Sequence, residues 1–118
     1  MSVSPQLSVD ASTVRNGCLE FAGGRHKEGL IGLTADGIIS HAEEEKMTFT
    51  ACETEPGDVV LFSSYVPHRS LANKSESSRN LLYLTYNAQS EGYQRDEYCA
   101  PKPQLPSVCS VSLVAVGV

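Results

Sequence analysis

A histidine, a serine, an asparagine and an arginine lie close together in the sequence and could between them hold a metal ion and an anion. They are His68, Ser70, Asn73 and Arg79. A neutral imidazole is the commonest protein ligand of transition metals, and a guanidinium forms bidentate, charge-assisted hydrogen bonds with a carboxylate. These residue types at this spacing favour a metal-and-anion site over an ordinary hydrophobic core.

Each of these side chains also has an ordinary structural explanation. His68 would then be a core histidine bonded to nearby backbone, and Arg79 would form a surface ion pair worth about 0–1 kcal/mol. An arginine that opens an apolar strand fits a surface pair poorly. Ser70 follows His68 by two residues and shares its face on a strand, whereas Asn73 is expected to cap the bend that follows.

Apolar segments flank these residues and would position them. Residues 59–62 follow a Pro-Gly-Asp turn, and residues 80–87 form a second run rich in leucine and tyrosine, so both segments are predicted strands. Residues 18–22 predict a short strand after an Asn-Gly turn. Residues 46–52 alternate apolar and polar side chains, which indicates a half-buried strand. We expect this strand to form an antiparallel hairpin with residues 59–62.

The whole chain consists of short predicted strands separated by turns, and no amphipathic helix of convincing length is present. This pattern predicts a mainly β fold of the sandwich, jelly-roll or barrel type. A length of 118 residues limits the chain to one domain with a modest core.

Composition narrows the partners and the compartment. The net charge of −5 and the pI of about 5.1 argue against nucleic acid and anionic membranes as partners. No apolar run approaches the ~20 residues of a membrane span, and residues 1–12 lack the apolar core of a secretory signal. The four cysteines, at positions 18, 52, 99 and 109, have no CxxC spacing. We interpret them as reduced thiols of an intracellular, cytoplasmic protein.

The pattern around His68 resembles the C-terminal half of the phytanoyl-CoA dioxygenase family, whose members are non-haem Fe(II)- and 2-oxoglutarate-dependent oxygenases. The resemblance rests on His68-x-Ser70-x-x-Asn73 and on Arg79 eleven positions after the histidine. A second segment, NGCLEFAGGRHK at residues 16–27, is similar to the family's N-G-C-L-x-x-x-P-G-[ST]-H-K. The sequence departs from that motif at residues 22–25, AGGR, where the family usually has proline and then a hydroxyl residue.

The resemblance covers residues 7–100 and implies a fold, cofactors and site residues. The implied fold is the second half of a double-stranded β-helix, a jelly-roll or cupin-like core. The implied cofactors are Fe(II), with His68 as a metal ligand, and 2-oxoglutarate, with Arg79 and Ser70 bonded to its distal carboxylate. No catalytic acid or base is assigned. Residues 101–118, three prolines followed by a small apolar stretch, are expected to be a divergent tail outside this partial domain.

Two iron ligands implied by the family have no counterpart in this sequence. The family places them in a His-x-Asp motif before the Asn-Gly turn, and the chain contains no such motif. His41-x-Glu43 has suitable residue types but follows that turn, so we interpret it as part of a solvated acidic surface. One protein ligand does not hold Fe(II) selectively, and we therefore expect the chain to be inactive by itself.

Three interpretations stay open. The chain is a fragment or truncated form of a dioxygenase that hydroxylates a small-molecule substrate, with 2-oxoglutarate converted to succinate and carbon dioxide. Alternatively, it is a non-catalytic binding or regulatory module that kept half of the fold. In the third interpretation it is a half-barrel that another chain completes by supplying the missing half of the core.

Overall fold

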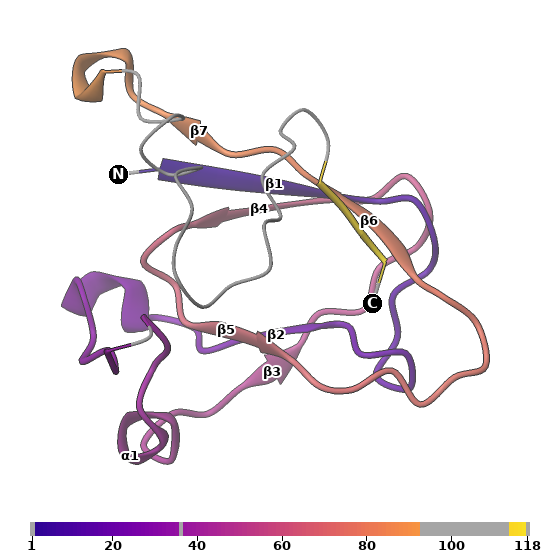
Figure 1. Cartoon of the computed structure of the whole chain (residues 1–118), viewed down its shortest axis with the longest axis horizontal. Helices are drawn as coiled ribbons and strands as arrows, with labels where there is room; N and C mark the ends of the chain where they lie inside the picture. Colours follow the sequence, from indigo (N-terminus) through magenta and orange to yellow (C-terminus); the bar gives the residue numbers. More distant parts are fainter. Residues whose placement is uncertain (1, 36, 93–113, 118) are drawn as a thin grey trace.

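The strands of the chain lie in two layers (Figure 1). The structure is a computed structural model that describes residues 2–35, 37–92 and 114–117. One layer has the strand order β4-β1-β6-β8, with β7 also paired to β1, and the other has the order β3-β2-β5. Every pairing between the named strands is antiparallel. This mainly β architecture confirms the predicted fold class.

The strands are short, as the spacing of the turns predicted. The first layer contains β1 (Ser2–Ser8), β4 (Val59–Ser63), β6 (Asn80–Tyr83), β7 (Tyr86–Asn87) and β8 (Val114–Gly117). The second layer contains β2 (Leu19–Phe21), β3 (Thr50–Ala51) and β5 (His68–Ser70). The described helices are single turns: α1 (His41–Glu44) and the 3₁₀ turns η1 (Arg25–Glu28) and η2 (Gln89–Glu91).

The predicted hairpin between residues 46–52 and residues 59–62 is wrong. β3 pairs with β2, with Ala51 opposite Glu20, whereas β4 pairs with β1 in the other layer. The turn between β3 and β4 leads the chain from one layer to the other. In this turn the N–H of Gly57 donates to the carbonyl of Ser8 at 2.8 Å, and the N–H of Ser8 donates to the carbonyl of Asp58 at 3.0 Å. These two bonds anchor the start of β4 to the end of β1.

The buried side chains of the described residues are as often polar as apolar. The buried apolar residues are Cys18, Leu19, Ala22 and Leu81, and the buried polar residues are Gln6, Ser8, Ser12, Thr54 and Arg79. Four of the polar ones bond in pairs: the hydroxyl oxygens of Ser8 and Thr54 lie 2.6 Å apart, and Arg79 donates to the hydroxyl of Ser12. Buried polar groups destabilise a core unless they are paired. An interior of paired polar side chains is therefore more typical of a ligand-binding site than of a hydrophobic core.

Gly17 holds the turn before β2 in a conformation that only glycine adopts easily. Its φ is 81°, and a Cβ there would collide with the carbonyl oxygen of Leu71. Gly24 has a φ of 83° but open space around it. The left-handed conformation costs other residues about 1–2 kcal/mol, and a backbone shift to relieve a clash costs about 1–3 kcal/mol more.

We therefore expect Gly17→Ala to lower the free energy of unfolding by about 3 kcal/mol and Gly24→Ala by about 1 kcal/mol. Urea denaturation of both variants and the wild type measures the difference. Equal losses would mean that the Leu71 carbonyl does not confine residue 17.

The predicted tail, residues 101–118, lies largely outside the described residues. Residues 114–117 form β8, which pairs with β6 so that Val116 stands opposite Leu81. β1 begins at Ser2, and the boundaries 7–100 of the partial domain stay a prediction. In the described part of the chain, no helix is long and apolar enough to cross a membrane.

Candidate functional site

His68 is the first residue of β5, and its ring is oriented by neighbours on both layers. It stands opposite Phe21 of β2, and its ring centroid lies 5.1 Å from that of Phe62 on β4 and 6.2 Å from that of Phe21. Its Nδ1 lies 2.9 Å from the carbonyl oxygen of Val66. Because a carbonyl only accepts, Nδ1 carries the proton of the bond, and in the neutral form of the ring the lone pair is on Nε2. That is the state in which an imidazole binds a metal.

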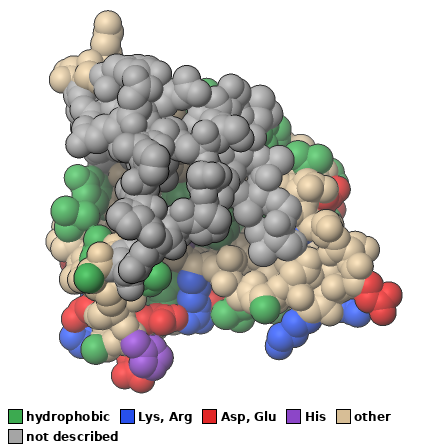
Figure 2. Space-filling model, in the orientation of Figure 1, with side chains coloured by type: hydrophobic (Ala, Val, Ile, Leu, Met, Phe, Trp, Pro, Cys, Tyr) green, Lys and Arg blue, Asp and Glu red, His purple; other side chains and the backbone are tan. Residues whose placement is uncertain are grey.

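Alternation along β5 separates the site from a supporting network of charges. His68 and Ser70 are exposed on one face, as predicted, and Arg69 points to the other face. There the guanidinium donates to Glu20 at 2.6 Å and to Glu44 of α1 at 2.7 Å, and it lies 4.2 Å from the centroid of the Phe49 ring. The hydrogen bond from Arg69 lowers the pKa of Glu44. Figure 2 shows charged side chains gathered over this edge of the molecule, where α1 lies.

Arg79 lies just before β6 and is only 1% exposed. Its Nη1 donates to the hydroxyl of Ser12 at 2.6 Å, its Nη2 to the carbonyl of Gly17 at 2.7 Å, and its Nε to the carbonyl of Asn16 at 3.3 Å. All three acceptors are uncharged. The burial excludes the surface ion pair that was the ordinary explanation of this arginine.

The structure places His68 and Arg79 at opposite ends of the pairing between β2 and β5. His68 stands opposite Phe21 at one end, and Arg79 bonds Gly17, which precedes β2, at the other. At ~3.3 Å per residue, the two ends lie on the order of 10 Å apart. No hydrogen bond joins Arg79 to His68 or Ser70 within the described residues, so a ligand would have to connect them.

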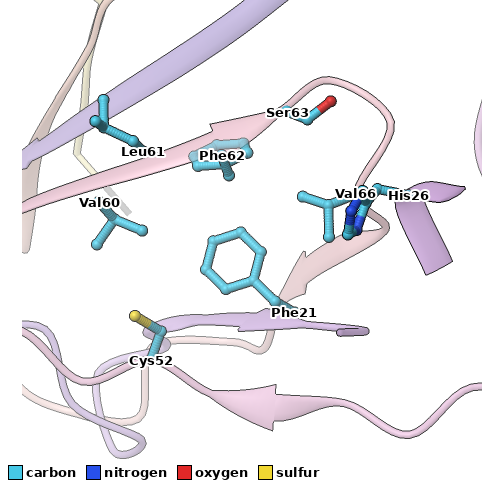
Figure 3. A pocket seen from close by; sticks show the side chains of 8 residues that line it. All are labelled: Phe21, His26, Cys52, Val60, Leu61, Phe62, Ser63 and Val66. Atoms are coloured by element: carbon cyan, nitrogen blue, oxygen red, sulfur yellow. The ribbon is translucent and has the colours of Figure 1, made fainter. Parts of the chain in front are cut away.

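Asn73 and His26 occupy the loops around the site. Asn73 caps the bend as predicted: its Oδ1 accepts from the N–H of Ser75 at 2.8 Å, and its Nδ2 donates to the carbonyl of Ser77 at 2.9 Å. The side chain of His26 faces a shallow pocket of about 250 Å³ whose walls include Phe21, Phe62 and Val66 (Figure 3). Two of these walls, Phe21 and Phe62, also contact the ring of His68.

The described residues fit one ligand of an iron ion and do not complete its site. His68 has the free Nε2 that such a metal needs. In residues 2–35, 37–92 and 114–117, no group of three His, Cys, Asp or Glu side chains could hold a metal ion. The histidine and carboxylate that a facial triad also requires are thus not assembled by this part of the chain.

The polar residues Gln6, Ser12 and Tyr83 were not identified as site residues from the sequence. Ser12 bonds Arg79, and the hydroxyl of Tyr83 donates to Oε1 of Gln6 at 3.3 Å. Burial raises the pKa of Tyr83, which the charge of Arg79 partly offsets. The available signal was the alternation of Ser4, Gln6 and Ser8 with apolar residues. This alternation indicates a strand, but it does not show which face of the strand is buried.

A sequence model of the phytanoyl-CoA dioxygenase family, PhyH, matches residues 3–81. The matched range includes β1 to the first residues of β6, together with His68, Ser70 and Arg79. The chain belongs to the phytanoyl-CoA dioxygenase family. The resemblance found in the two sequence motifs is therefore confirmed over most of the chain.

Relatives within this family are named as hydroxylases and dioxygenases. The chain is 41% identical over 100 residues to the methylphosphonate hydroxylase of Gimesia maris and 43% identical over 100 residues to a 2-aminoethylphosphonate dioxygenase of an uncultured bacterium. Each match covers 85% of this chain and 38% of the relative. The chain therefore spans well under half the length of these family members.

Solved structures agree on the fold. EctD from S. alaskensis, crystallised with 2-oxoglutarate and 5-hydroxyectoine, superposes on 75% of this chain with a TM-score of 0.63 and 23% identity, and 32% of EctD is covered. The non-heme alpha-ketoglutarate-dependent carbocyclase SnoK superposes on 72% of the chain with a TM-score of 0.57 and 19% identity, and 35% of SnoK is covered. This phytanoyl-CoA dioxygenase family chain thus has part of the oxygenase fold.

Proposed function

We propose that the chain is the C-terminal part of an Fe(II)- and 2-oxoglutarate-dependent hydroxylase of small phosphonates. In this proposal His68 binds the iron through Nε2, and Arg79 with Ser70 binds the distal carboxylate of 2-oxoglutarate. The chain alone is inactive, because the remaining two iron ligands belong to a part of the enzyme that these residues do not include. In this proposal the enzyme is intracellular, a compartment in which free thiols such as those of Cys18 and Cys52 stay reduced.

The burial of Arg79 without an acidic partner among the described residues is the observation that carries the proposal. A guanidinium stays charged in proteins, and buried charges are ordinarily paired with an opposite charge. Among the described residues, its three partners are neutral oxygen atoms. A carboxylate ligand would supply the missing negative charge, and the guanidinium has five N–H groups, two more than these bonds use.

The separation of His68 and Arg79 suits an elongated ligand with a metal-binding end and an anionic end. When Fe(II) and 2-oxoglutarate are bound, they supply the oxygen activation that places a hydroxyl group on a C–H bond of the substrate. The residues of this chain orient them: the carbonyl of Val66 holds the ring of His68, and Ser12 holds the guanidinium. Phe21 and Phe62 pack beside the His68 ring and exclude water from that side.

The substrate class rests on the two relatives named for methylphosphonate and 2-aminoethylphosphonate, each above 40% identity over 100 residues. We test it with a fusion in which this chain replaces the 100-residue segment that it matches in the Gimesia maris hydroxylase. We expect the fusion to show the weak visible charge-transfer band of anaerobic Fe(II) and 2-oxoglutarate, and to release succinate when methylphosphonate or 2-aminoethylphosphonate is added in air.

The isolated chain serves as the control and should give neither the band nor succinate. A folded fusion that binds Fe(II) and 2-oxoglutarate but hydroxylates neither phosphonate would contradict the substrate class. A folded fusion without the band would contradict the enzyme assignment and favour the non-catalytic module. Succinate release by the isolated chain would show that its own residues complete the metal site.

A further inference from the structure

Gln6 on β1 is a buried side chain whose amide group is only half used. The residue is 2% exposed, and its Oε1 accepts a hydrogen bond from the hydroxyl of Tyr83 at 3.3 Å. Within the described part of the chain, no group accepts from its Nε2, which carries two N–H donors. This nitrogen is not fully enclosed, since Nε of Arg25 is the only enclosed side-chain nitrogen or oxygen without a partner among the described residues. The free donors of Gln6 therefore border a space that a small molecule can enter.

The strand register shows that Gln6 points between the two layers. It stands opposite Val60 of β4 and opposite Tyr83 of β6, and directly opposed residues of antiparallel strands project from the same face. Val60 lines the shallow pocket of Figure 3, where its side chain points toward Phe21 of the other layer. Gln6 and this pocket therefore face the same interior space.

The proposed iron ligand borders this space as well. Phe21 and Phe62, two walls of the pocket, contact the ring of His68. Phe62 stands opposite Ser4, which precedes Gln6 by two residues on the same face of β1. At ~3.3 Å per residue, Gln6 lies on the order of 7 Å farther along the layer than Ser4. A small ligand held close to His68 is thus within reach of the amide.

The charge of Arg79 acts on this part of the interior. Burial raises the pKa of Tyr83, and the positive charge of Arg79 partly offsets that rise, so the guanidinium lies close enough to influence the phenol. Among the described residues, no carboxylate bonds the side chains of Gln6, Tyr83 or Arg79. Two free amide N–H groups in the field of a guanidinium favour the oxygen atoms of an anion.

We propose that Nε2 of Gln6 binds an oxygen atom of the substrate's phosphonate group, and that the hydroxyl of Tyr83 holds the amide in position to do so. The inference rests on the proposed function, which assigns the two ends of 2-oxoglutarate to the iron at His68 and to Arg79 with Ser70. The phosphonate is the remaining anion of that reaction. Gln6 is therefore a specificity-determining residue that favours an anionic substrate over a neutral one of the same size.

Binding of methylphosphonate to the fusion with the Gimesia maris hydroxylase tests this inference. The calorimetric titration is anaerobic, with Fe(II) and 2-oxoglutarate present, so that no substrate is consumed. Gln6→Leu keeps the size of the side chain and removes both donors, so it should raise the Kd of methylphosphonate by at least about tenfold. The Kd of 2-oxoglutarate, titrated separately, should not change. Gln89→Leu, the same substitution at an exposed position on η2, is the matched control and should leave both constants unchanged.

Urea denaturation of the intact 118-residue chain separates binding from folding. The double variant, Gln6→Leu with Tyr83→Phe, removes the hydroxyl and its acceptor together. Replacing both partners of a buried hydrogen bond by apolar groups of the same shape is nearly neutral or stabilising. We therefore expect the urea midpoint of the double variant to equal or exceed that of the wild type. A lowered midpoint would assign the amide to folding and overturn the inference.

The outcomes also distinguish this inference from the proposed activity. A wild-type fusion that binds methylphosphonate without hydroxylating it, and loses this binding with Gln6→Leu, would contradict the activity and support the inference. Equal methylphosphonate affinities of the wild type and Gln6→Leu would overturn the inference. A loss of 2-oxoglutarate affinity in place of methylphosphonate affinity would assign the amide to the cofactor and overturn it as well. No binding of methylphosphonate by the wild-type fusion would overturn both the inference and the substrate class.

Discussion

Arg79→Ala is expected to lower the free energy of unfolding by about 4 kcal/mol, the largest loss of stability among the substitutions considered. The side chain is 1% exposed, and its removal leaves the hydroxyl of Ser12 and the carbonyls of Asn16 and Gly17 without their donor. Each buried group that loses its partner costs about 1–3 kcal/mol, and the cavity adds to this loss. Urea denaturation monitored by circular dichroism gives the value.

The same substitution tests the role of the guanidinium in 2-oxoglutarate binding. In the fusion with the Gimesia maris hydroxylase, 2-oxoglutarate at 100 times its dissociation constant should stabilise the protein that retains Arg79 by about 2.7 kcal/mol. Neither Arg79→Ala nor Arg79→Lys should gain this stabilisation, because a lysine lacks the planar fork. Arg15→Ala, at an exposed position, is the matched control and should change stability by less than about 0.5 kcal/mol. An unchanged response of Arg79→Lys to 2-oxoglutarate would remove Arg79 from that site.

The local sequence pattern predicted strands with a strong apolar run, such as β4. It missed β1, whose buried face is polar. Residues 59–62 were predicted because their apolar run is strong, and β4 covers Val59–Ser63. The sequence analysis predicts no strand for residues 2–8, yet β1 is the central strand of its layer. Its inward face carries Gln6 and Ser8, both buried. A rule that expects apolar residues inside cannot find a strand that lines a polar site.

The shared face of His68 and Ser70 followed from the period of two along a strand, and the pairing of these residues with Phe21 and Leu19 bears it out. The surroundings of Arg79 could not be obtained in this way. Its hydroxyl and carbonyl acceptors are 62 to 67 residues away in the sequence. Strand pairing over such separations depends on the whole topology, and the mistaken hairpin of residues 46–52 failed for the same reason.

His68→Ala is expected to abolish the Fe(II)–2-oxoglutarate band of the fusion and to reduce phosphonate hydroxylation by more than about 100-fold. Loss of a group that merely orients a metal ligand costs about 10–100-fold in affinity or activity, so loss of the ligand itself should cost more. The fold should be affected little, because His68 is exposed and its removal forfeits ring contacts with Phe21 and Phe62 worth about 1 kcal/mol. Anaerobic titration and succinate release measure the two losses.

The isolated chain offers an independent check on His68, because it contains three histidines that nuclear magnetic resonance can distinguish. When the ring is neutral, the bond to the Val66 carbonyl requires the Nδ1–H tautomer, so ¹⁵N shifts recorded at alkaline pH should identify Nε2 of His68 as the unprotonated nitrogen. His41, 82% exposed on α1, is the matched control, and His41→Ala should leave the band and the activity of the fusion intact. An Nε2–H tautomer at His68, or equal losses from both alanine variants, would mean that this imidazole is not poised to bind the metal.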